Sequence, residues 1–130
     1  MTPGDRLRGL RADHDGALLL ADALIHASGQ TAPGLAGAFL EFFDDFSWEH
    51  LVSEEAELLP AVDRVDPALA ERVRGEHEQL RAAARLVRVG EPDARRLQAL
   101  GRLRRGHVRL EEGQLYPRFD ASPLPAAARG

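Results

Sequence analysis

Four segments of the chain place their apolar residues three and four positions apart, which is the spacing of one helix face. They run approximately from Pro3 to Ala27, Thr31 to Pro60, Asp66 to Gly90 and Glu91 to Pro117. β-Branched residues are few, and no segment alternates apolar and polar residues as a half-buried strand does. Helices of similar length with short loops predict an all-α fold, an up-down-up-down antiparallel four-helix bundle.

The chain has 130 residues, enough for one domain with a core and too few for two. We expect the bundle to cover residues 1–118. Residues 119–130 are rich in Ala and Pro without periodicity, so we expect them to form a flexible C-terminal tail.

Composition excludes several classes of function. The chain has no Cys, which excludes disulfides, thiolate metal ligands and Cys nucleophiles. The net charge is -4 and no basic block is present, so nucleic acid is not an expected partner. The N-terminus is charged, and no apolar run approaches the roughly 18–20 residues of a membrane span. We therefore expect a cytoplasmic protein with no membrane partner, and we leave its oligomeric state open.

One pattern, H-x-x-x-E-E-x-x-L-x-P, occurs twice, beginning at His50 and again at His107. Residues four apart lie on the same face of a helix, about 5–6 Å apart between Cβ atoms. His50 with Glu54, and His107 with Glu111, therefore each offer an imidazole and a carboxylate on one face. Imidazole suits iron, zinc, copper and nickel, and a carboxylate can bridge two metal ions.

Four histidines fall on the apolar faces of the four predicted helices. His14 and His77 lie about ten residues after a helix start, and His50 and His107 lie about ten residues before a helix end. In an antiparallel bundle all four share one level, roughly 15 Å from one end. A buried imidazole without a partner costs about 1–3 kcal/mol, so this layer predicts a metal centre rather than an ordinary core.

Other residues near the patterns have different expected roles. Glu55 and Glu112 are expected at the surface, although Glu112 replaces Glu111 as a ligand if the last helix is slightly rotated. His26 follows His14 by twelve residues, which turns it away by about 120°, so we expect it to be exposed. The aromatic residues around His50 are expected to pack in the core and to line the metal centre with apolar surface: Phe39, Phe42, Phe43, Phe46 and Trp48.

From Arg6 to Pro117 the sequence resembles the hemerythrin-like (HHE cation-binding) family. The resemblance rests on His14 in RADHDG, on the two repeated patterns and on His77 in GEHEQL. It implies a four-helix bundle holding a non-haem di-iron centre, two iron ions bridged by two carboxylates and an oxo or hydroxo group. The ligands that it implies are His14, His50, Glu54, His77, His107 and Glu111.

The chain departs from the oxygen-carrying members of that family, which place two histidines four residues apart on the third helix. The corresponding positions here are Val73 and Arg81, so only four histidines are available. Six side chains and one shared hydroxide give about ten of the roughly twelve bonds that two six-coordinate irons need. About one position stays open on each iron. The only tyrosine, Tyr116, lies nine residues beyond His107 and is not expected to reach.

These ligands predict a di-iron protein that binds O2, NO or peroxide for sensing, delivery or storage. We favour binding because a lone domain without a second cofactor site has no obvious electron input. The alternatives are an oxidoreductase that decomposes peroxide, as a catalase or peroxidase does, and an iron-responsive sensor or reservoir. Zinc or manganese could also occupy such a site. The Glu-x-x-His motif of ferritin-like bundles is absent.

Overall fold

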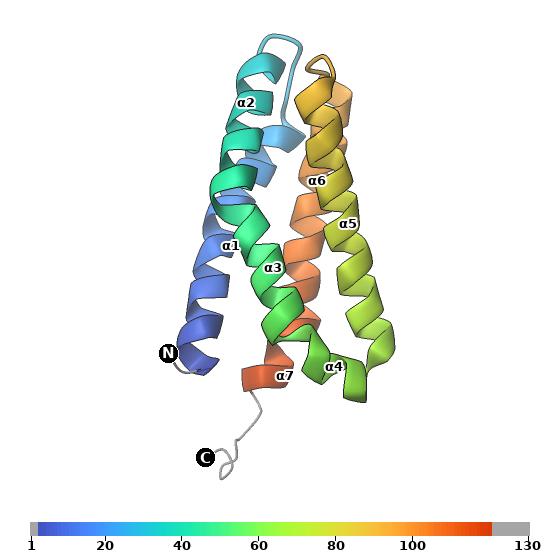
Figure 1. Ribbon diagram of the computed structural model, residues 1–130. Coiled ribbons are helices and arrows are strands. Elements are labelled where there is room, and N and C mark those ends of the chain that lie inside the picture. The colour runs from blue at the N-terminus through green and yellow to red at the C-terminus, as the bar shows by residue number, and fades with distance from the viewer. Residues whose placement is uncertain (1–2, 121–130) are drawn as a thin grey trace.

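The structure is a computed structural model that describes residues 3–120 (Figure 1). The described residues form helices and no strand, so the all-helical prediction is confirmed. In chain order the elements are α1 (Pro3–Ile25), α2 (Ala32–Phe42), the π-helical turn η1 (Phe43–Ser47), α3 (Trp48–Glu57), α4 (Leu59–Val65), α5 (Pro67–Val89), α6 (Ala94–Leu110), the π-helical turn η2 (Glu111–Leu115) and α7 (Pro117–Asp120).

The long helices lie side by side along the length of the molecule (Figure 1). The turns that precede α2 and α6 lie at one end, whereas α4, α7 and the start of α1 lie at the other. α1 packs chiefly against α6, and α4 packs chiefly against α5. Within residues 3–120, no helix is long and apolar enough to cross a lipid bilayer.

Two of the helices begin with an aspartate side chain that caps the first turn. The Asp66 carboxylate accepts a hydrogen bond from the backbone N–H of Leu69 at 3.2 Å. The Asp93 carboxylate accepts from the backbone N–H groups of Arg95 and Arg96, at 2.8 and 3.2 Å. Each cap satisfies N–H groups that have no partner inside the helix and contributes about 1 kcal/mol. These caps fix where α5 and α6 begin.

Two prolines begin helices where we expected helices to end. α3 ends at Glu57, and Pro60 lies in the first turn of α4. Pro117 is the first residue of α7. Proline lacks a backbone N–H, so the first turn of a helix tolerates it well. The short helices α4 and α7 therefore close the same end of the bundle.

The bundle extends beyond residue 118, where we expected it to end. Phe119 and Asp120 belong to α7, and Phe119 packs against the apolar core at that end of the molecule. The rest of the predicted tail, residues 121–130, lies outside the described residues.

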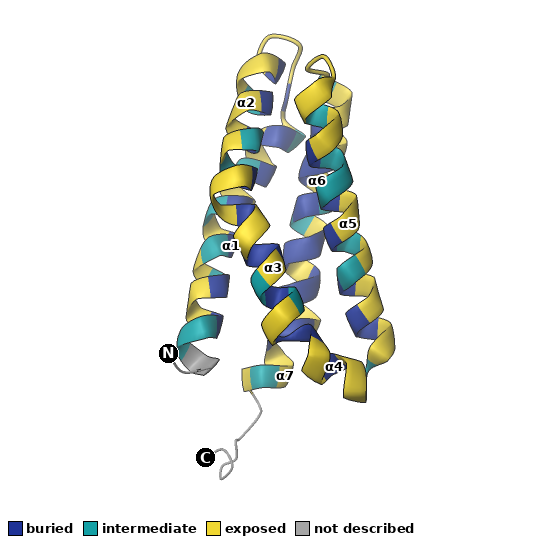
Figure 2. Ribbon diagram, viewed as in Figure 1, coloured by how far each residue is buried: buried dark blue, intermediate teal, exposed yellow. Residues whose placement is uncertain are grey.

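The apolar core consists of two clusters at opposite ends of the bundle, on the inward faces of the helices (Figure 2). The first, which we call the closed-end cluster, lies beside α4 and α7: Leu7, Leu10, Leu58, Leu59, Val62, Leu69, Ala70, Val73, Leu110, Leu115 and Tyr116. The second, the turn-end cluster, lies toward the turns before α2 and α6: Leu24, Ala27, Ala32, Ala36, Phe39, Phe43, Leu51, Leu80, Ala84, Leu97 and Leu100.

The π-helical turn η1 changes which aromatic residues face the core. We expected the inner face to pass through Phe42 and Phe46 to His50. Phe43 is buried instead, whereas Phe46 is 53% and Trp48 51% exposed. The backbone N–H of Trp48 donates to the carbonyl of Phe43, five residues earlier, so the turn holds one residue more than an α-helical turn. The core-packing prediction is therefore wrong for Phe46 and Trp48.

Gly101 allows α6 to approach the backbone of α1. A Cβ atom at this position would lie 2.7 Å from the carbonyl oxygen of Ala21 and 2.9 Å from the backbone nitrogen of Ile25. Both distances are shorter than van der Waals contact, and backbone atoms cannot move aside without shifting the helix. A residue without a side chain is therefore required where these two helices cross.

We expect Gly101→Ala to lower the free energy of unfolding by about 1–3 kcal/mol, because it forces α1 and α6 apart. The matched control is Gly106→Ala on the same helix, where a Cβ meets no atom within 4 Å. That change should stabilise the protein by up to about 1 kcal/mol through helix propensity. Urea denaturation measures both, and equal effects would contradict the close approach.

Candidate metal centre

Four histidines from four helices meet in one layer between the two apolar clusters. They are His14 on α1, His50 on α3, His77 on α5 and His107 on α6, each at most 3% exposed. The ring centroids of His14 and His50 lie 4.9 Å apart, as do those of His77 and His107. The structure thus brings together the imidazoles that the sequence placed at one level.

Glu111 lies at the centre of this layer and is fully buried. Its Oε1 lies 2.9 Å from Nε2 of His14 and 3.6 Å from Nε2 of His50. Its Oε2 lies 2.9 Å from Nε2 of His107 and 3.3 Å from Nε2 of His77. Each oxygen of this carboxylate therefore faces a different pair of imidazoles.

Glu54 divides its two oxygens between the same two pairs. Its Oε2 lies 3.1 Å from Nε2 of His50, and its Oε1 lies 3.0 Å from Nε2 of His77. Glu54 is also fully buried. Two carboxylates thus lie between two pairs of imidazoles, with one oxygen of each directed to each pair.

The donor atoms form two overlapping sets, and within each set all of them lie within 4.8 Å of one another. The first, set A, comprises His14, His50, Glu54 and Glu111, and the second, set B, comprises Glu54, His77, His107 and Glu111. Because both sets use the same two carboxylates, two cations held by them would be bridged by Glu54 and Glu111.

The structure separates the roles of the paired acids. Glu111 points inward, whereas Glu112 is 38% exposed at its side chain and accepts a hydrogen bond from the outer nitrogen of His14. His26 is exposed, and its Nδ1 donates to the backbone carbonyl of Asp22 on its own helix. The structure therefore places Glu111 among the inner donors and His26 away from them.

The outer nitrogen of every histidine meets a carboxylate. Nδ1 lies 2.8 Å from Glu112 in His14, 3.0 Å from Asp13 in His50, 2.7 Å from Glu55 in His77 and 2.7 Å from Glu76 in His107. A carboxylate that accepts from Nδ1–H fixes the ring orientation and leaves the lone pair of Nε2 directed inward. All four imidazoles are thus oriented to bind a cation.

These four outer carboxylates connect the helices in a closed ring. Asp13 on α1 contacts the histidine of α3, and Glu55 on α3 contacts that of α5. Glu76 on α5 contacts the histidine of α6, and Glu112 on η2 contacts that of α1. Each helix therefore supplies one inner imidazole and also orients the imidazole of its neighbour.

Sequence reasoning missed this ring, although a signal was present. Each outer carboxylate directly precedes or follows an inner donor along the chain, as Asp13 does for His14 and Glu55 for Glu54. Adjacent residues are rotated by about 100° around a helix. A residue next to an inward-pointing donor is therefore expected at the surface, which is why these acids were not assigned a role. These side chains are only half-exposed because they reach sideways to the next helix.

Tyr116 corrects the expectation that it lies too far from the histidines. It is fully buried, and its hydroxyl donates to Glu54 Oε2 at 2.5 Å. The Tyr116 hydroxyl oxygen also lies 3.2 Å from Nε2 of His14 and 3.4 Å from Nε2 of His50. The only tyrosine in the chain is therefore part of the buried polar layer.

The turn η2 explains why Tyr116 reaches this layer. In a regular α-helix, Tyr116 would be rotated about 140° from Glu111 and would face away from it. Instead its backbone N–H donates to the Glu111 carbonyl, five residues earlier, at 2.8 Å. Such an i to i−5 bond turns the later residue back toward the face of the earlier one.

Val73 and Arg81, the two positions at which a fifth histidine was sought, have other roles in the structure. Val73 is fully buried in the closed-end cluster. Arg81 donates from both terminal nitrogens to Glu55, at 2.9 and 3.0 Å. Since Glu55 accepts from His77, Arg81 fixes the acid that orients this histidine.

The carboxylates dominate the electrostatics of the layer. Burial alone lowers the pKa of His50, but hydrogen bonds with Asp13, Glu111 and Glu54 outweigh burial and raise this pKa to about 11. Burial likewise lowers the pKa of His77, and Glu111 and Glu54 raise it to about 9. Without a cation, the carboxylates favour protonated imidazoles.

One atom in the layer points specifically to a cation. Nε2 of His107 is buried and has no hydrogen-bond partner among the described residues, although Glu111 Oε2 lies 2.9 Å away. A buried donor or acceptor without a partner costs about 1–3 kcal/mol. A metal ion between this nitrogen and the carboxylate would satisfy both, so the donors present fit a metal centre.

The raised histidine pKa values predict an unusual pH dependence for the metal-free protein. The folded state holds protons that an unfolded histidine releases near its ordinary pKa of 6.5. This stabilisation is complete below about pH 6.5 and is lost as pH rises through the folded pKa of His77, about 9. Thermal unfolding in the presence of a chelator should therefore show a falling midpoint between pH 6.5 and 9.

The metal-loaded protein is the control, because its ligands are deprotonated and cation binding competes with protons. The difference in midpoint between loaded and metal-free protein should increase over the same pH range. A metal-free protein that becomes more stable between pH 6.5 and 9 would contradict the electrostatic account.

The model of the hemerythrin HHE cation binding domain matches residues 5–119 of the chain. No curated protein and no solved structure matches the chain. The matched residues include both donor sets and the outer carboxylates. Because the match spans nearly the whole chain, the protein belongs to the hemerythrin HHE family, whose helical domain binds metal cations through histidine and glutamate side chains.

Proposed function

We propose that the domain binds two iron ions bridged by Glu54 and Glu111 and that this centre takes O2, NO or peroxide as its ligand. The observation that carries the proposal is the overlap of sets A and B, which share both carboxylates. A single cation would need only one of these sets. Two sets with common carboxylates are the donor arrangement that a dinuclear centre requires.

The donor chemistry favours iron. Each cation would meet two imidazole nitrogens and two carboxylate oxygens, and the chain has no thiolate to offer. Mixed nitrogen and oxygen donors suit iron and also permit zinc or manganese. Iron would supply the binding of small ligands and the exchange of electrons with them. The chain's own residues hold the donors in place and limit water around them.

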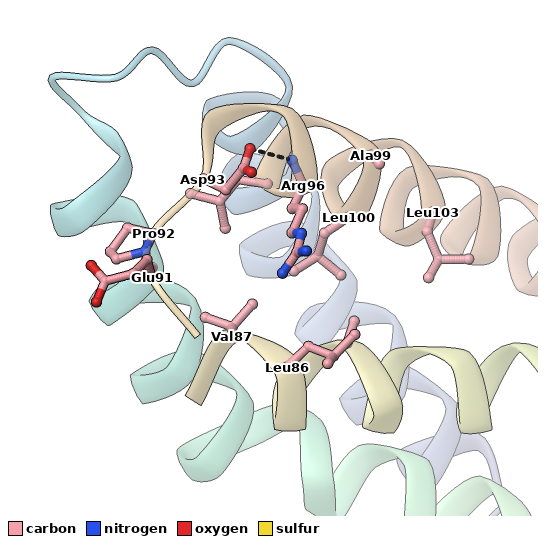
Figure 3. A pocket seen from close by; sticks show the side chains of 12 residues that line it. Leu86, Val87, Glu91, Pro92, Asp93, Arg96, Ala99, Leu100 and Leu103 are labelled. Carbon is pink, nitrogen blue, oxygen red and sulfur yellow. Dashed lines mark hydrogen bonds between the residues drawn. The ribbon is translucent and has the colours of Figure 1, made fainter. Parts of the chain in front are cut away.

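A largely apolar pocket lies toward the turn end of the bundle, between two helices that carry donors of set B. A pocket of about 380 Å³ opens between α5 and α6, the helices that carry His77 and His107. Leu86 and Val87 of α5 lie opposite Leu100 and Leu103 of α6 (Figure 3). Leu103 precedes His107 by four residues, about 6 Å along the helix. The lining is mostly apolar, with Glu91, Asp93 and Arg96 at the turn, and an apolar lining accommodates small apolar molecules such as O2 and NO.

A second pocket reaches the opposite side of the layer. It has a volume of about 250 Å³ and lies between α1 and α3, where Asp13 and His50 form part of its wall. Asp5, Arg6 and Glu49 also line it. This polar pocket therefore reaches the layer at His50.

The direct test is metal analysis and absorption spectroscopy of protein from iron-replete cells. We expect about two irons per chain, since each donor set holds one cation. His77→Ala should reduce the iron content sharply, because it removes a donor from set B. His26→Ala is the matched control and should retain the full content, because His26 is exposed. Equal losses from both variants, or no iron in the parent protein, would refute the proposal.

The outer carboxylates make a second prediction. Glu76→Gln replaces the charged acceptor of the His107 Nδ1–H with a neutral amide oxygen, without changing a donor in either set. Changing such a partner typically costs 10–100-fold in metal affinity, and we expect a loss in this range. Competition with a chelator measures it. Glu71→Gln, at an exposed position on the same helix, should leave the affinity unchanged.

An iron reservoir or sensor is the second candidate, favoured by the many ionisable groups that the fold buries. Four histidines, two carboxylates and Tyr116 share the interior, so metal occupancy is tightly linked to folding. Adding O2 or peroxide to the reduced protein separates the functions. A reversible oxygen adduct supports binding, oxygen evolution from peroxide supports an enzyme, and metal loss with partial unfolding supports a sensor.

A further inference from the structure

We propose that the Tyr116 hydroxyl oxygen is a fifth side-chain donor to the cation of set A, and that this makes the two cations unequal. The inference rests on the proposed dinuclear centre, and it assigns to one residue a role that the sequence pattern did not indicate.

The distances around the Tyr116 oxygen support coordination. It lies 2.5 Å from Glu54 Oε2, 3.2 Å from His14 Nε2, 3.4 Å from His50 Nε2 and 3.5 Å from Glu111 Oε1. These are the four donor residues of set A. Two bonds of about 2.1 Å that meet at a right angle separate their donor atoms by about 3.0 Å. The four distances of the Tyr116 oxygen lie within 0.5 Å of this value, so the oxygen has the position of a fifth donor next to the other four.

The protein holds the ring of Tyr116 firmly in this position. Its plane is stacked on the ring of His14, with the centroids 5.2 Å apart and the planes inclined by 10°. The Arg11 guanidinium lies over the same ring, 5.4 Å from its centroid. Arg11 in turn binds Asp120 of α7, with Nη2 at 2.5 Å from the carboxylate. The hydroxyl is therefore positioned before any cation binds.

Set B has no such donor among the described residues. Counting side chains alone, the set A cation has five donors and the set B cation has four. A small ligand therefore finds an open position at the set B cation first. The pocket between α5 and α6 lies between the two helices that carry His77 and His107.

The proton of the tyrosine is displaced when the bond forms. In the metal-free protein the O–H group donates to Glu54 Oε2, an atom that itself becomes a donor to the cation. The phenol O–H bond breaks, the oxygen binds the cation as phenolate, and the proton is released to water. No electron is transferred in this step.

The chain contains a single tyrosine, which makes the experiment unambiguous. Protein loaded with two iron(III) ions should show a visible charge-transfer band from phenolate to iron and the phenolate ring vibrations in its resonance Raman spectrum. Loading with gallium(III), which has no redox chemistry, should produce the ultraviolet difference spectrum of one tyrosinate per chain. Any tyrosinate signal must come from Tyr116.

Tyr116→Phe should abolish these signals while two irons remain bound, and Trp48→Phe, at an exposed aromatic residue, should keep them. A wild-type protein that holds two iron(III) or gallium(III) ions without a phenolate signal would overturn the inference, since Tyr116 would then only donate a hydrogen bond to Glu54. That result would leave the dinuclear centre intact. A protein that takes up neither metal would overturn the proposed function together with the inference.

Discussion

The burial of six ionisable side chains in the middle of a small core is the constraint on which the rest of this structure depends. Two apolar clusters lie above and below four imidazoles and two carboxylates, and the Tyr116 hydroxyl is the polar group that the closed-end cluster offers them. Unpaired charges in such surroundings cost several kcal/mol each, so the layer must be neutralised from within or by a cation. The mutual contacts of the histidines with Glu54 and Glu111 supply part of this compensation. Nε2 of His107 lies 2.9 Å from Glu111 without making a hydrogen bond to it, so the side chains alone leave this nitrogen's hydrogen-bonding capacity unused.

Compensation also comes from outside the layer, and it links the helices to one another. Each imidazole is held at its outer nitrogen by an acid from a neighbouring helix, so a shift of any helix along its axis would break two of these contacts. Arg81 on α5 also donates to Glu55 and so holds the carboxylate that orients His77. The relative height of the helices and the aim of the donors are thus set by the same hydrogen bonds. A bundle stabilised by apolar packing alone would tolerate small shifts that this one does not.

The two π-helical turns adjoin the layer and change its surroundings, since η1 ends three residues before His50 and η2 begins with Glu111. η1 exposes Phe46 and Trp48 and buries Phe43, whereas η2 brings Tyr116 to the face of Glu111. π-Helical turns are frequent at functional sites because one extra residue redirects a side chain without ending the helix. Here the extra residue in η2 gives one half of the centre an oxygen that the other half lacks. We infer that the inequality of the two halves follows from this backbone irregularity and not from the histidines, which are distributed evenly.

The sequence determined the helices and the common level of the four histidines, because these depend on the periodicity of the apolar residues. It also placed Glu54 and Glu111 one turn from their histidines, where the structure finds them. Only the tertiary structure decided the roles of Asp13, Glu55, Glu76, Glu112 and Tyr116. The outer acids act across helix interfaces, and the spacing within one helix carries no information about what a neighbour presents. The position of Tyr116 depends on a hydrogen bond from its backbone N–H to the carbonyl of Glu111, five residues earlier. A regular α-helix with 3.6 residues per turn does not predict this bond.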